Sequence, residues 1–508
     1  MIGLTGKLIF IGVLSIIVFS ISLYFFNYIP DDTFITLRYA KNALRGYGLV
    51  FNRWDRVEGY SNFLWLTLLI MMGKIGFPLV LSARAGSLLL SFAVIIVSAL
   101  YARTAVNPSD SDTRKALTIG LPALSLSASA VLSTWSMSGT ELPFFTLFLL
   151  LSALALVKEK ESLALTFSAT LALIRPEGLA LFVATWLFLL FESGNREKTF
   201  IKGLSIALIL YVPYVIWKNH YFGSVIPNTY YAKRGPANVM LGNGLSYLLT
   251  YMISYGYMLL AALYILRKKI FQSRPLKFAL YITLIHWITT VIAGGDWMPN
   301  FRLLLPTTPF VLFLTSMAIV EGLYTNTALG EDPATSRIFT ISAVLVILSI
   351  APAFVNYDLF KAEKVSVEAF ANVGKKLKQI LPPGTTLACG STGAIGYYSD
   401  MPIVDILGLT DSHIARKGKV VSTQPGHLKT DGTYILNRKP ALLLFGNVLI
   451  HKGEWDESKM KIKIQEKEVT SMTQFRNLYE YINIPMGYGF YLSCYKRRDF
   501  FLPVNSDK

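Results

Sequence analysis

Two adjacent carboxylates, Asp31 and Asp32, follow the first long apolar stretch of the chain, residues 8–28. That stretch is long enough to cross a bilayer, so the pair lies at a membrane surface. A carboxylate placed there can accept the proton of an attacking hydroxyl. Adjacent helical residues point about 100° apart, so one Asp would act as the base while the other orients it, holds a cation or caps a helix. Capping alone is left open, because either Asp follows Pro30 and suits the N-cap of a helix expected at 33–45.

The composition is that of a polytopic membrane protein. Of 508 residues, 53% are apolar and 16% are charged, and the mean hydropathy is +0.47. The net charge of +17 is scattered over loops, which favours anionic lipid headgroups or a phosphorylated lipid over nucleic acid as a partner. Cys389 and Cys494 are expected to be buried thiols, with a disulfide left open. No small-x-small cleavage site follows residues 8–28, so we interpret that stretch as a retained helix.

Eleven apolar stretches are expected to span the membrane. They cover residues 8–28, 83–101, 117–133, 141–157, 162–174, 176–192, 203–217, 247–266, 278–293, 303–322 and 338–354. Residues 61–77 are also apolar, but counting them as a span would put the later basic loops on different sides. Basic side chains of short loops stay cytoplasmic, and the loops near Arg114, Lys158, Lys198 and Lys268 share one side only if 61–77 does not cross. We therefore expect an interfacial helix there, along the outer leaflet.

This topology predicts a transmembrane domain at 1–355 and a small extracytoplasmic α/β domain at 356–508. Within the first, 29–82 is the first extracytoplasmic loop, with interfacial helices. Loops 29–60, 134–140, 218–246 and 294–302 and the turn 175–178 are expected to converge on the same outer face. In the second domain, short buried strands are expected at 386–390, 402–408 and 441–445, and helices at 364–381 and 392–399.

Several basic and aromatic residues in the outer segments suit a lipid phosphate or a sugar. Arg175 either snorkels to lipid headgroups or binds an anion, and the nearby Glu177 favours an internal ion pair. Lys233 and Arg302 can hold a phosphate, the latter bidentately. The aromatic residues of these outer segments can stack on sugar rings or serve as ordinary anchors at the membrane–water interface.

The C-terminal motifs around Gly393, Asp405, His413 and His427 are expected to form solvated loops. The glycine spacing is not a nucleotide fingerprint, and the His and Asp residues lack metal-ligand spacing. The sequence contains no P-loop, zinc motif or serine-hydrolase elbow.

The motifs resemble those of a bacterial group of GT-C glycosyltransferases, in order along nearly the whole chain. The opening runs from Asp31-Asp32-Thr33-Phe34 to Ser61-Asn62-Phe63-Leu64-Trp65, and within the group it is most similar to terminal arabinofuranosyltransferases. Later matches are Ser138-Gly139-Thr140-Glu141, Arg175-Pro176-Glu177-Gly178, Pro227–Lys233, Gly295–Pro299 and Asp405–Asp411. The resemblance implies a GT-C bundle, a catalytic acidic residue in the first outer loop, interfacial helices in that loop and an extracytoplasmic cap.

The resemblance also implies a function, namely transfer of a sugar from a polyprenyl-phosphate donor. The acceptor would be a hydroxyl on a cell-envelope glycan, lipid or protein, and the sugar could be arabinofuranose. The catalytic candidates are Asp31 and Asp32. The donor-phosphate candidates are Arg175, Lys233, Arg302 and Tyr231. The other substrate-binding candidates are Arg38, Glu58, Tyr60, Asn62, Glu141, Glu177, Asn228, Tyr230, Asp296, Trp297, His413 and His427.

No cofactor is certain, and a divalent cation held by carboxylates is left open. We expect a multi-pass protein of the bacterial inner (plasma) membrane, with the active site and the C-terminal domain extracytoplasmic. The alternatives are a transporter or lipid flippase and a non-catalytic scaffold whose outer domain binds glycan. The absence of an internal repeat in the sequence speaks against a transporter.

Overall fold

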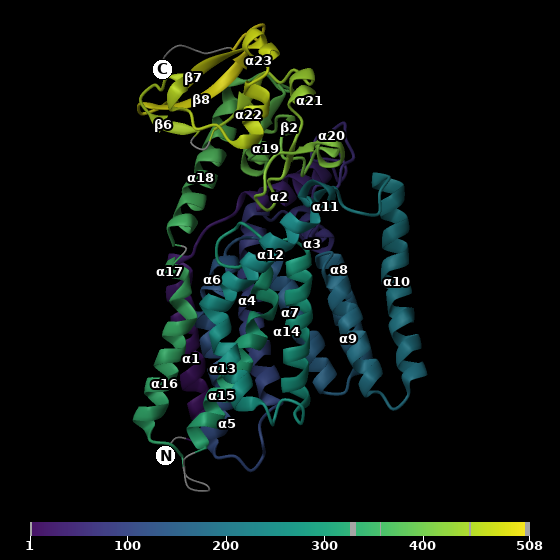
Figure 1. Ribbon diagram of the computed structural model, residues 1–508, viewed down its shortest axis with the longest axis vertical. Coiled ribbons are helices and arrows are strands. Elements are labelled where there is room, and N and C mark those ends of the chain that lie inside the picture. Colours follow the sequence, from purple (N-terminus) through teal and green to yellow (C-terminus); the bar gives the residue numbers. More distant parts are fainter. Residues whose placement is uncertain (1–2, 326–331, 356, 447–448, 503–508) are drawn as a thin grey trace. The chain divides into compact units, whose positions relative to one another are not determined.

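The structure is a computed structural model that describes residues 3–325, 332–355, 357–446 and 449–502. The chain folds into two compact units, each assembled from three separate segments (Figure 1). Unit 1 comprises residues 1–28, 81–215 and 240–359, and unit 2 comprises residues 29–80, 216–239 and 360–508. The first predicted loop and the segment around residue 228 therefore fold together with the C-terminal region.

Unit 1 is helical in its described residues. Its helices, some of which begin or end in unit 2, are α1 (Leu4–Phe25), α4 (Leu79–Arg103), α5 (Asp112–Ala128), α6 (Ala130–Ser136), α7 (Leu142–Val157), α8 (Glu161–Ile174), α9 (Gly178–Glu192), α10 (Arg196–Phe222), α12 (Ala237–Tyr251), η1 (Met252–Gly256), α13 (Tyr257–Leu266), α14 (Arg274–Ile292), η2 (Arg302–Thr307), α15 (Thr308–Tyr324), α16 (Thr335–Ile350) and α17 (Pro352–Val355). Helix α15 lies in the core, whereas α1 and α10 expose large apolar side chains such as Phe10 and Ile209. Such exposed faces suit a lipid solvent.

The helices of unit 1 agree with the predicted spans. Six described helical segments are long and apolar enough to cross a membrane, namely α1, α4, α10, α12–α13, α14 and η2–α15. The pair α5–α6, bent by 61° at Ser129, forms a seventh candidate, and α7, α8, α9 and α16 are shorter apolar helices. Helix α3 (Phe63–Lys74), a short apolar helix of 12 residues, packs on α2 (Asp31–Leu44) within unit 2. This agrees with the expectation that 61–77 does not cross.

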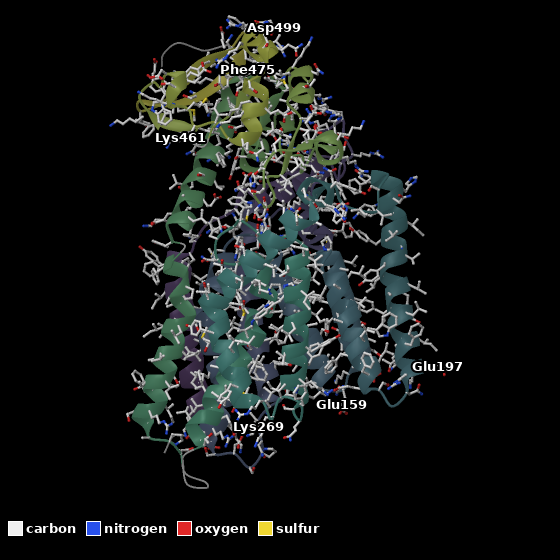
Figure 2. All side chains as sticks on the ribbon, viewed as in Figure 1. Glu159, Glu197, Lys269, Lys461, Phe475 and Asp499 are labelled. Carbon is white, nitrogen blue, oxygen red and sulfur yellow. The ribbon has the colours of Figure 1, made fainter. Side chains whose placement is uncertain are left out.

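The basic loops lie at one end of the unit 1 helices. Arg274 pairs with Glu192 at 2.9 Å, which joins two of these loops. Glu321 pairs with both Lys269, at 2.7 Å, and Arg114, at 3.1 Å, which joins the loop near Lys268 to the one near Arg114. Figure 2 shows Glu159, Glu197 and Lys269 together at this end. The prediction that these loops share one side is therefore confirmed.

Unit 2 contains a six-stranded sheet of order β2-β1-β5-β8-β6, with β7 also paired to β8 (Figure 1). Strands β2, β1 and β5 run parallel, and β8 is antiparallel to β5, β6 and β7. The strands are β1 (Leu387–Cys389), β2 (Ile403–Asp405), β5 (Leu442–Leu444), β6 (Ile450–Lys452), β7 (Tyr479–Gly487) and β8 (Phe490–Arg497), and β3 (Lys419–Val420) pairs with β4 (Lys429–Thr430) separately. The parallel strands are buried over their whole length, which explains their unbroken apolar runs.

Helices surround this sheet, and four of them (α2, α3, α18 and α19) were predicted from the sequence. Besides α2 and α3 they are α11 (Asn228–Lys233), α18 (Tyr357–Ile380), α19 (Thr392–Ser399), α20 (Ser412–Lys417), α21 (Gly432–Asn437), η3 (Glu457–Lys459), α22 (Ile464–Thr470) and α23 (Thr473–Leu478). The predicted helices at 364–381 and 392–399 and the three predicted strands are confirmed. The β7–β8 hairpin was missed. Cys389 and Cys494 are free and buried, as expected.

Candidate active site

Asp31 caps a helix, but not its own. Helix α2 begins at Asp31 with Pro30 at the N-cap, and no side chain caps it. The Asp31 carboxylate instead accepts hydrogen bonds from the backbone N–H groups of Gly393 (2.9 Å) and Ala394 (2.7 Å) in the first turn of α19. These are the donors that a helix start leaves unsatisfied. Asp31 therefore fixes the beginning of α2 against the beginning of α19.

Small residues on α19 let α2 come this close. A Cβ atom on Gly393 would lie 2.0 Å from the Asp31 carbonyl oxygen, and one on Gly396 would lie 3.0 Å from Arg38. Arg38 is 5% exposed and donates to the carbonyls of Phe51 (2.9 Å), Met401 (2.7 Å) and Gly396. The expectation of a solvated loop is wrong at Gly393 and Gly396, because both are buried against α2.

Asp32 lies in a group of charged side chains drawn from five segments of unit 2. We call this group the Asp32 cluster. Its members are Asp31 and Asp32 of α2, Glu363 of α18, His427 before β4, Lys463 at the start of α22 and Lys233 at the end of α11. Asp32 and Lys463, more than 400 positions apart in the sequence, both act electrostatically on Glu363 and on His427.

The Asp32 cluster shifts the pKa values of its members. Burial raises the pKa of Asp31 to about 6, helped by Asp32 and opposed by the Gly393 and Ala394 N–H groups and by Lys463. Burial, with Asp31 and Asp32, raises the pKa of Glu363 to about 7, against the effect of Lys463. Burial and the two lysines lower the pKa of His427, against the attraction of Asp32. Carboxylates held in such a setting are stronger bases than free ones.

The sequence does not single out two members of the cluster, Glu363 and Lys463. Glu363 lies on an amphipathic helix whose charged residues look like a solvated face. Lys463 lies in a run of alternating lysines, Lys459 to Lys467, in which no position stands out. Only the docking of α18 and α22 near α2 distinguishes them, and neither contains a local motif.

Asp405 and Asn228 hold the neighbouring segments in place. Asp405 is fully buried, so the solvated-loop expectation is wrong here too, and it accepts hydrogen bonds from the N–H groups of Leu407 (3.0 Å) and Thr410 (2.7 Å). Burial raises the pKa of Asp405 to about 6. Asn228 Nδ2 donates to the carbonyl of Gly408 (2.8 Å), which attaches the segment before α11 to this turn.

The predicted substrate residues of the first loop contact protein groups. Glu58 pairs with Lys218 at 2.8 Å in a buried position, and burial raises the Glu58 pKa to about 7 although Lys218 lowers it. Asn62 exchanges hydrogen bonds with Thr36 at 3.1–3.3 Å. The buried Tyr60 ring lies 4.9 Å from the ring of Tyr39.

The other predicted aromatic and His residues of unit 2 have different surroundings. Tyr230 is 44% exposed, so its ring is accessible. The Tyr231 ring lies 4.2 Å from the guanidinium carbon of Arg416. His413 does not join the Asp32 cluster, because its Nε2 lies 2.9 Å from an Asp431 oxygen and its ring stacks on Tyr434 at 4.0 Å.

In unit 1, the predicted phosphate residues Arg175 and Arg302 are already ion-paired. Arg175 contacts both Glu141 and Glu177, and Arg302 Nε lies 2.6 Å from an Asp296 oxygen. The internal ion pair expected for Glu177 is therefore confirmed. The predicted residue Trp297 donates its backbone N–H to Asp296 at 2.9 Å.

Two turns of unit 1, at 134–140 and 294–302, meet beside these ion pairs. Trp135 Nε1 donates to the Asn300 carbonyl at 3.2 Å, and Asn300 Nδ2 donates to Thr134 Oγ1 at 2.8 Å. Asn300 and Phe301 both have positive φ, 56° and 51°, a conformation that non-glycine residues rarely adopt. The expected convergence of 134–140, 175–178 and 294–302 is confirmed within unit 1. Among the described residues, no three His, Cys, Asp or Glu side chains are placed to hold a metal ion together.

Parts of the chain are similar in sequence to known proteins. Residues 358–497 match a family described as a domain of unknown function (DUF8728). The chain is 27% identical over 326 residues to a terminal beta-(1->2)-arabinofuranosyltransferase of Corynebacterium glutamicum, covering 55% of this chain and 46% of the relative. It is 28% identical over 221 residues to the protein of the same name from Mycobacterium tuberculosis, covering 41% and 35%. The chain thus spans less than half the length of both relatives.

Solved structures show the same fold at low sequence identity. ArnT from Cupriavidus metallidurans, bound to undecaprenyl phosphate, superposes with a TM-score of 0.57 at 12% identity, covering 96% of this chain and 98% of ArnT. The Archaeoglobus fulgidus oligosaccharyltransferase, in complex with zinc and sulfate, gives a TM-score of 0.52 at 12% identity, covering 98% and 74%. The chain therefore has the GT-C fold, a polytopic helical bundle with a small C-terminal sheet domain.

Proposed function

We propose that this chain is a membrane glycosyltransferase that moves a sugar from a polyprenyl-phosphate donor to a hydroxyl acceptor of the cell envelope. The observation that carries the proposal is the likeness to ArnT over 96% of the chain, in a structure that binds undecaprenyl phosphate. The two arabinofuranosyltransferase relatives support arabinofuranose as the sugar and an envelope glycan as the acceptor. None of these relatives is named a transporter, so we do not propose transport.

In the proposed reaction, Asp32 accepts the proton of the acceptor hydroxyl. The acceptor oxygen attacks the anomeric carbon as the bond from that carbon to the phosphate oxygen breaks, and polyprenyl phosphate leaves with the bonding electron pair. The leaving group gains negative charge and needs nearby cations more than a proton donor. Lys233, Arg175 and Arg302 are the cations we assign to it, with Tyr231 beside Lys233. A divalent cation stays open as a cofactor.

The remaining candidates would bind sugar and acceptor. Tyr230 offers an accessible ring for stacking. The other proposed contacts are Arg38, Glu58, Tyr60, Asn62, Glu141, Glu177, Asn228, Asp296, Trp297, His413 and His427. We also propose the division into a transmembrane catalytic domain at 1–355 and a cap at 356–508. The membrane would be the bacterial plasma membrane, with the basic end of unit 1 in the cytoplasm and the cap outside.

The test is transfer by the purified full-length protein in lipid nanodiscs. A radiolabelled polyprenyl-phosphate arabinofuranose would be offered with an arabinan oligosaccharide, beside donors that carry other sugars. We expect label in the oligosaccharide and release of polyprenyl phosphate from one donor of the panel. A folded protein that moves none of these sugars, with and without added Mg²⁺ or Mn²⁺, would refute the proposal.

A further inference from the structure

Arg84 is a charged residue within the apolar helix α4, near its start. Helix α4 is a candidate span of 25 residues. A charged side chain inside a span is costly, and it is kept where it faces the bundle interior or a ligand. The Arg84 Nη2 donates to Asn27 Oδ1. Its Nε is buried and makes no hydrogen bond within the described part of the chain.

Hydrogen bonds and ring contacts place Arg84 near the outer turns of unit 1. Its partner Asn27 precedes Tyr28, whose ring lies 6.0 Å from the Trp135 ring. Trp135 in turn lies 5.8 Å from the guanidinium carbon of Arg302. The structure therefore connects Arg84 to Arg302 through Asn27, Tyr28 and Trp135.

A second path leads from Arg84 to Arg175. Ser87 lies on the same face of α4, one turn along the helix, and its Oγ donates to the Thr140 carbonyl at 2.7 Å. The next residue, Glu141, pairs with Arg175. Arg175 and Arg302 also lie close enough to repel each other. Arg175 and Arg302 therefore lie at the segment 135–141, and the turn of α4 that carries Arg84 and Ser87 contacts this segment at Thr140.

The arginine at 84 differs from the other two in its partners. Arg175 is held by two carboxylates and Arg302 by one, so a phosphate at either must compete with a carboxylate already bound. Among the described residues Arg84 makes no ion pair, and its partner is a neutral amide. A phosphate that reaches the Nε of Arg84 has no anion to displace, and a guanidinium edge matches two phosphate oxygens.

We propose that Arg84 binds the phosphate of the polyprenyl-phosphate substrate. The inference rests on the proposed function, because it names the residue that holds the donor of that reaction. A phosphate at this position also comes from bulk phospholipid. A snorkelling arginine extends its charged head into the headgroup layer, whereas the Nε of Arg84 is buried, which favours the polyprenyl substrate.

Binding of undecaprenyl phosphate to the full-length protein tests this, by native mass spectrometry or titration in phosphatidylcholine nanodiscs. We expect R84Q to weaken binding about tenfold or more, because a charge-assisted hydrogen bond is lost. The R84K variant, a point charge without the guanidinium edge, should weaken it less. The matched control is Arg103→Gln, an exposed arginine at the other end of α4, which should bind as the wild type does. If R84Q binds undecaprenyl phosphate as tightly as the wild type, the proposal is overturned. If R84Q does not fold, wild-type affinity in R84K overturns the proposal instead.

Competition separates the two sources of phosphate. We expect phosphatidylglycerol and inorganic phosphate, at the same concentration, to leave undecaprenyl phosphate bound. If phosphatidylglycerol displaced undecaprenyl phosphate from the wild type as well as unlabelled undecaprenyl phosphate does, and R84Q lost binding of both lipids equally, Arg84 would bind lipid headgroups in general. This result would overturn the proposal. The transfer assay then distinguishes the two failures. Arg84-dependent binding without transfer refutes the function and keeps the phosphate site, whereas transfer with an unchanged donor KM in R84Q refutes the site alone.

Discussion

Asp31 and Asp32 are adjacent in the sequence, but their surroundings give them different roles. Both Asp31 oxygens accept hydrogen bonds from N–H groups of α19, and these bonds fix the orientation of the Asp31 carboxylate. Asp32 acts electrostatically on His427, which also feels the positive charges of Lys463 and Lys233. We therefore assign the base to Asp32 and an anchoring role to Asp31.

The first prediction separates these roles. Asp32→Asn should lower the transfer rate by roughly 10²–10⁴-fold, because general base catalysis is lost, and should leave the melting temperature unchanged. Asp31→Ala should instead destabilise the protein by about 1 kcal/mol, as the loss of a helix cap does. The measurements are transfer kinetics and differential scanning fluorimetry. Full activity in Asp32→Asn would exclude Asp32 as the base.

The second prediction concerns the pH dependence of stability. Glu363 has a pKa of about 7 in the folded protein, above its ordinary value of 4.5, so between these values the folded state binds more protons than the unfolded state. Its contribution to stability is complete below pH 4.5 and is lost as the pH rises through 7. The melting temperature of the wild type should therefore fall between pH 4.5 and pH 8, and the fall should be smaller in Glu363→Gln. Glu368→Gln, at an exposed position on the same helix, is the control and should retain the wild-type slope. A wild-type slope in Glu363→Gln would contradict the prediction.

At the scale of elements, the contact of α2 with α19 depends on glycine. Gly393→Ala would place a Cβ 2.0 Å from a backbone oxygen of Asp31, and a backbone oxygen cannot turn aside as a side chain can. We expect a loss of roughly 2 kcal/mol or more in stability, together with reduced transfer because the start of α2 moves. Scanning fluorimetry of the purified protein measures the first effect.

The control for this substitution is Gly242→Ala in helix α12, where an added Cβ meets nothing within 4 Å. It should leave the melting temperature unchanged or raise it slightly, since alanine favours helix. Equal melting temperatures for Gly393→Ala and wild type would show that α19 can move away from α2 without cost.

The elements themselves could be predicted largely from sequence, because their signals are local. Unbroken apolar runs predicted the buried strands near residues 388 and 443, and the length of the apolar stretches predicted the membrane spans. The β7–β8 hairpin gives a weak signal because β7 is mostly partly exposed and β8 is buried only at its middle four residues, so neither strand has a regular apolar face. The site was predicted less well. Asp31 was identified, but its partners lie more than 360 positions away, and no local pattern encodes such a pairing.

For the whole molecule, the proposed function depends on which side of the membrane each part faces. The ion pairs of unit 1 join the basic loops at one end, and basic loops stay in the cytoplasm. The Asp32 cluster is formed from the first loop and the C-terminal region, both in unit 2. A polyprenyl-phosphate sugar presented outside the membrane can react only if unit 2 is extracytoplasmic.

The last prediction tests this orientation with cysteine labelling. Both native cysteines are buried, so an impermeant maleimide should react with them slowly and leave a low background. Lys461→Cys, at an exposed position of unit 2, should react in intact spheroplasts. Glu159→Cys, whose side chain is 86% exposed at the basic end of unit 1, should react only after the membrane is permeabilised. Labelling of both positions in intact spheroplasts would contradict the topology. The reverse pattern would place the Asp32 cluster in the cytoplasm, where it could not act on an outer-leaflet donor.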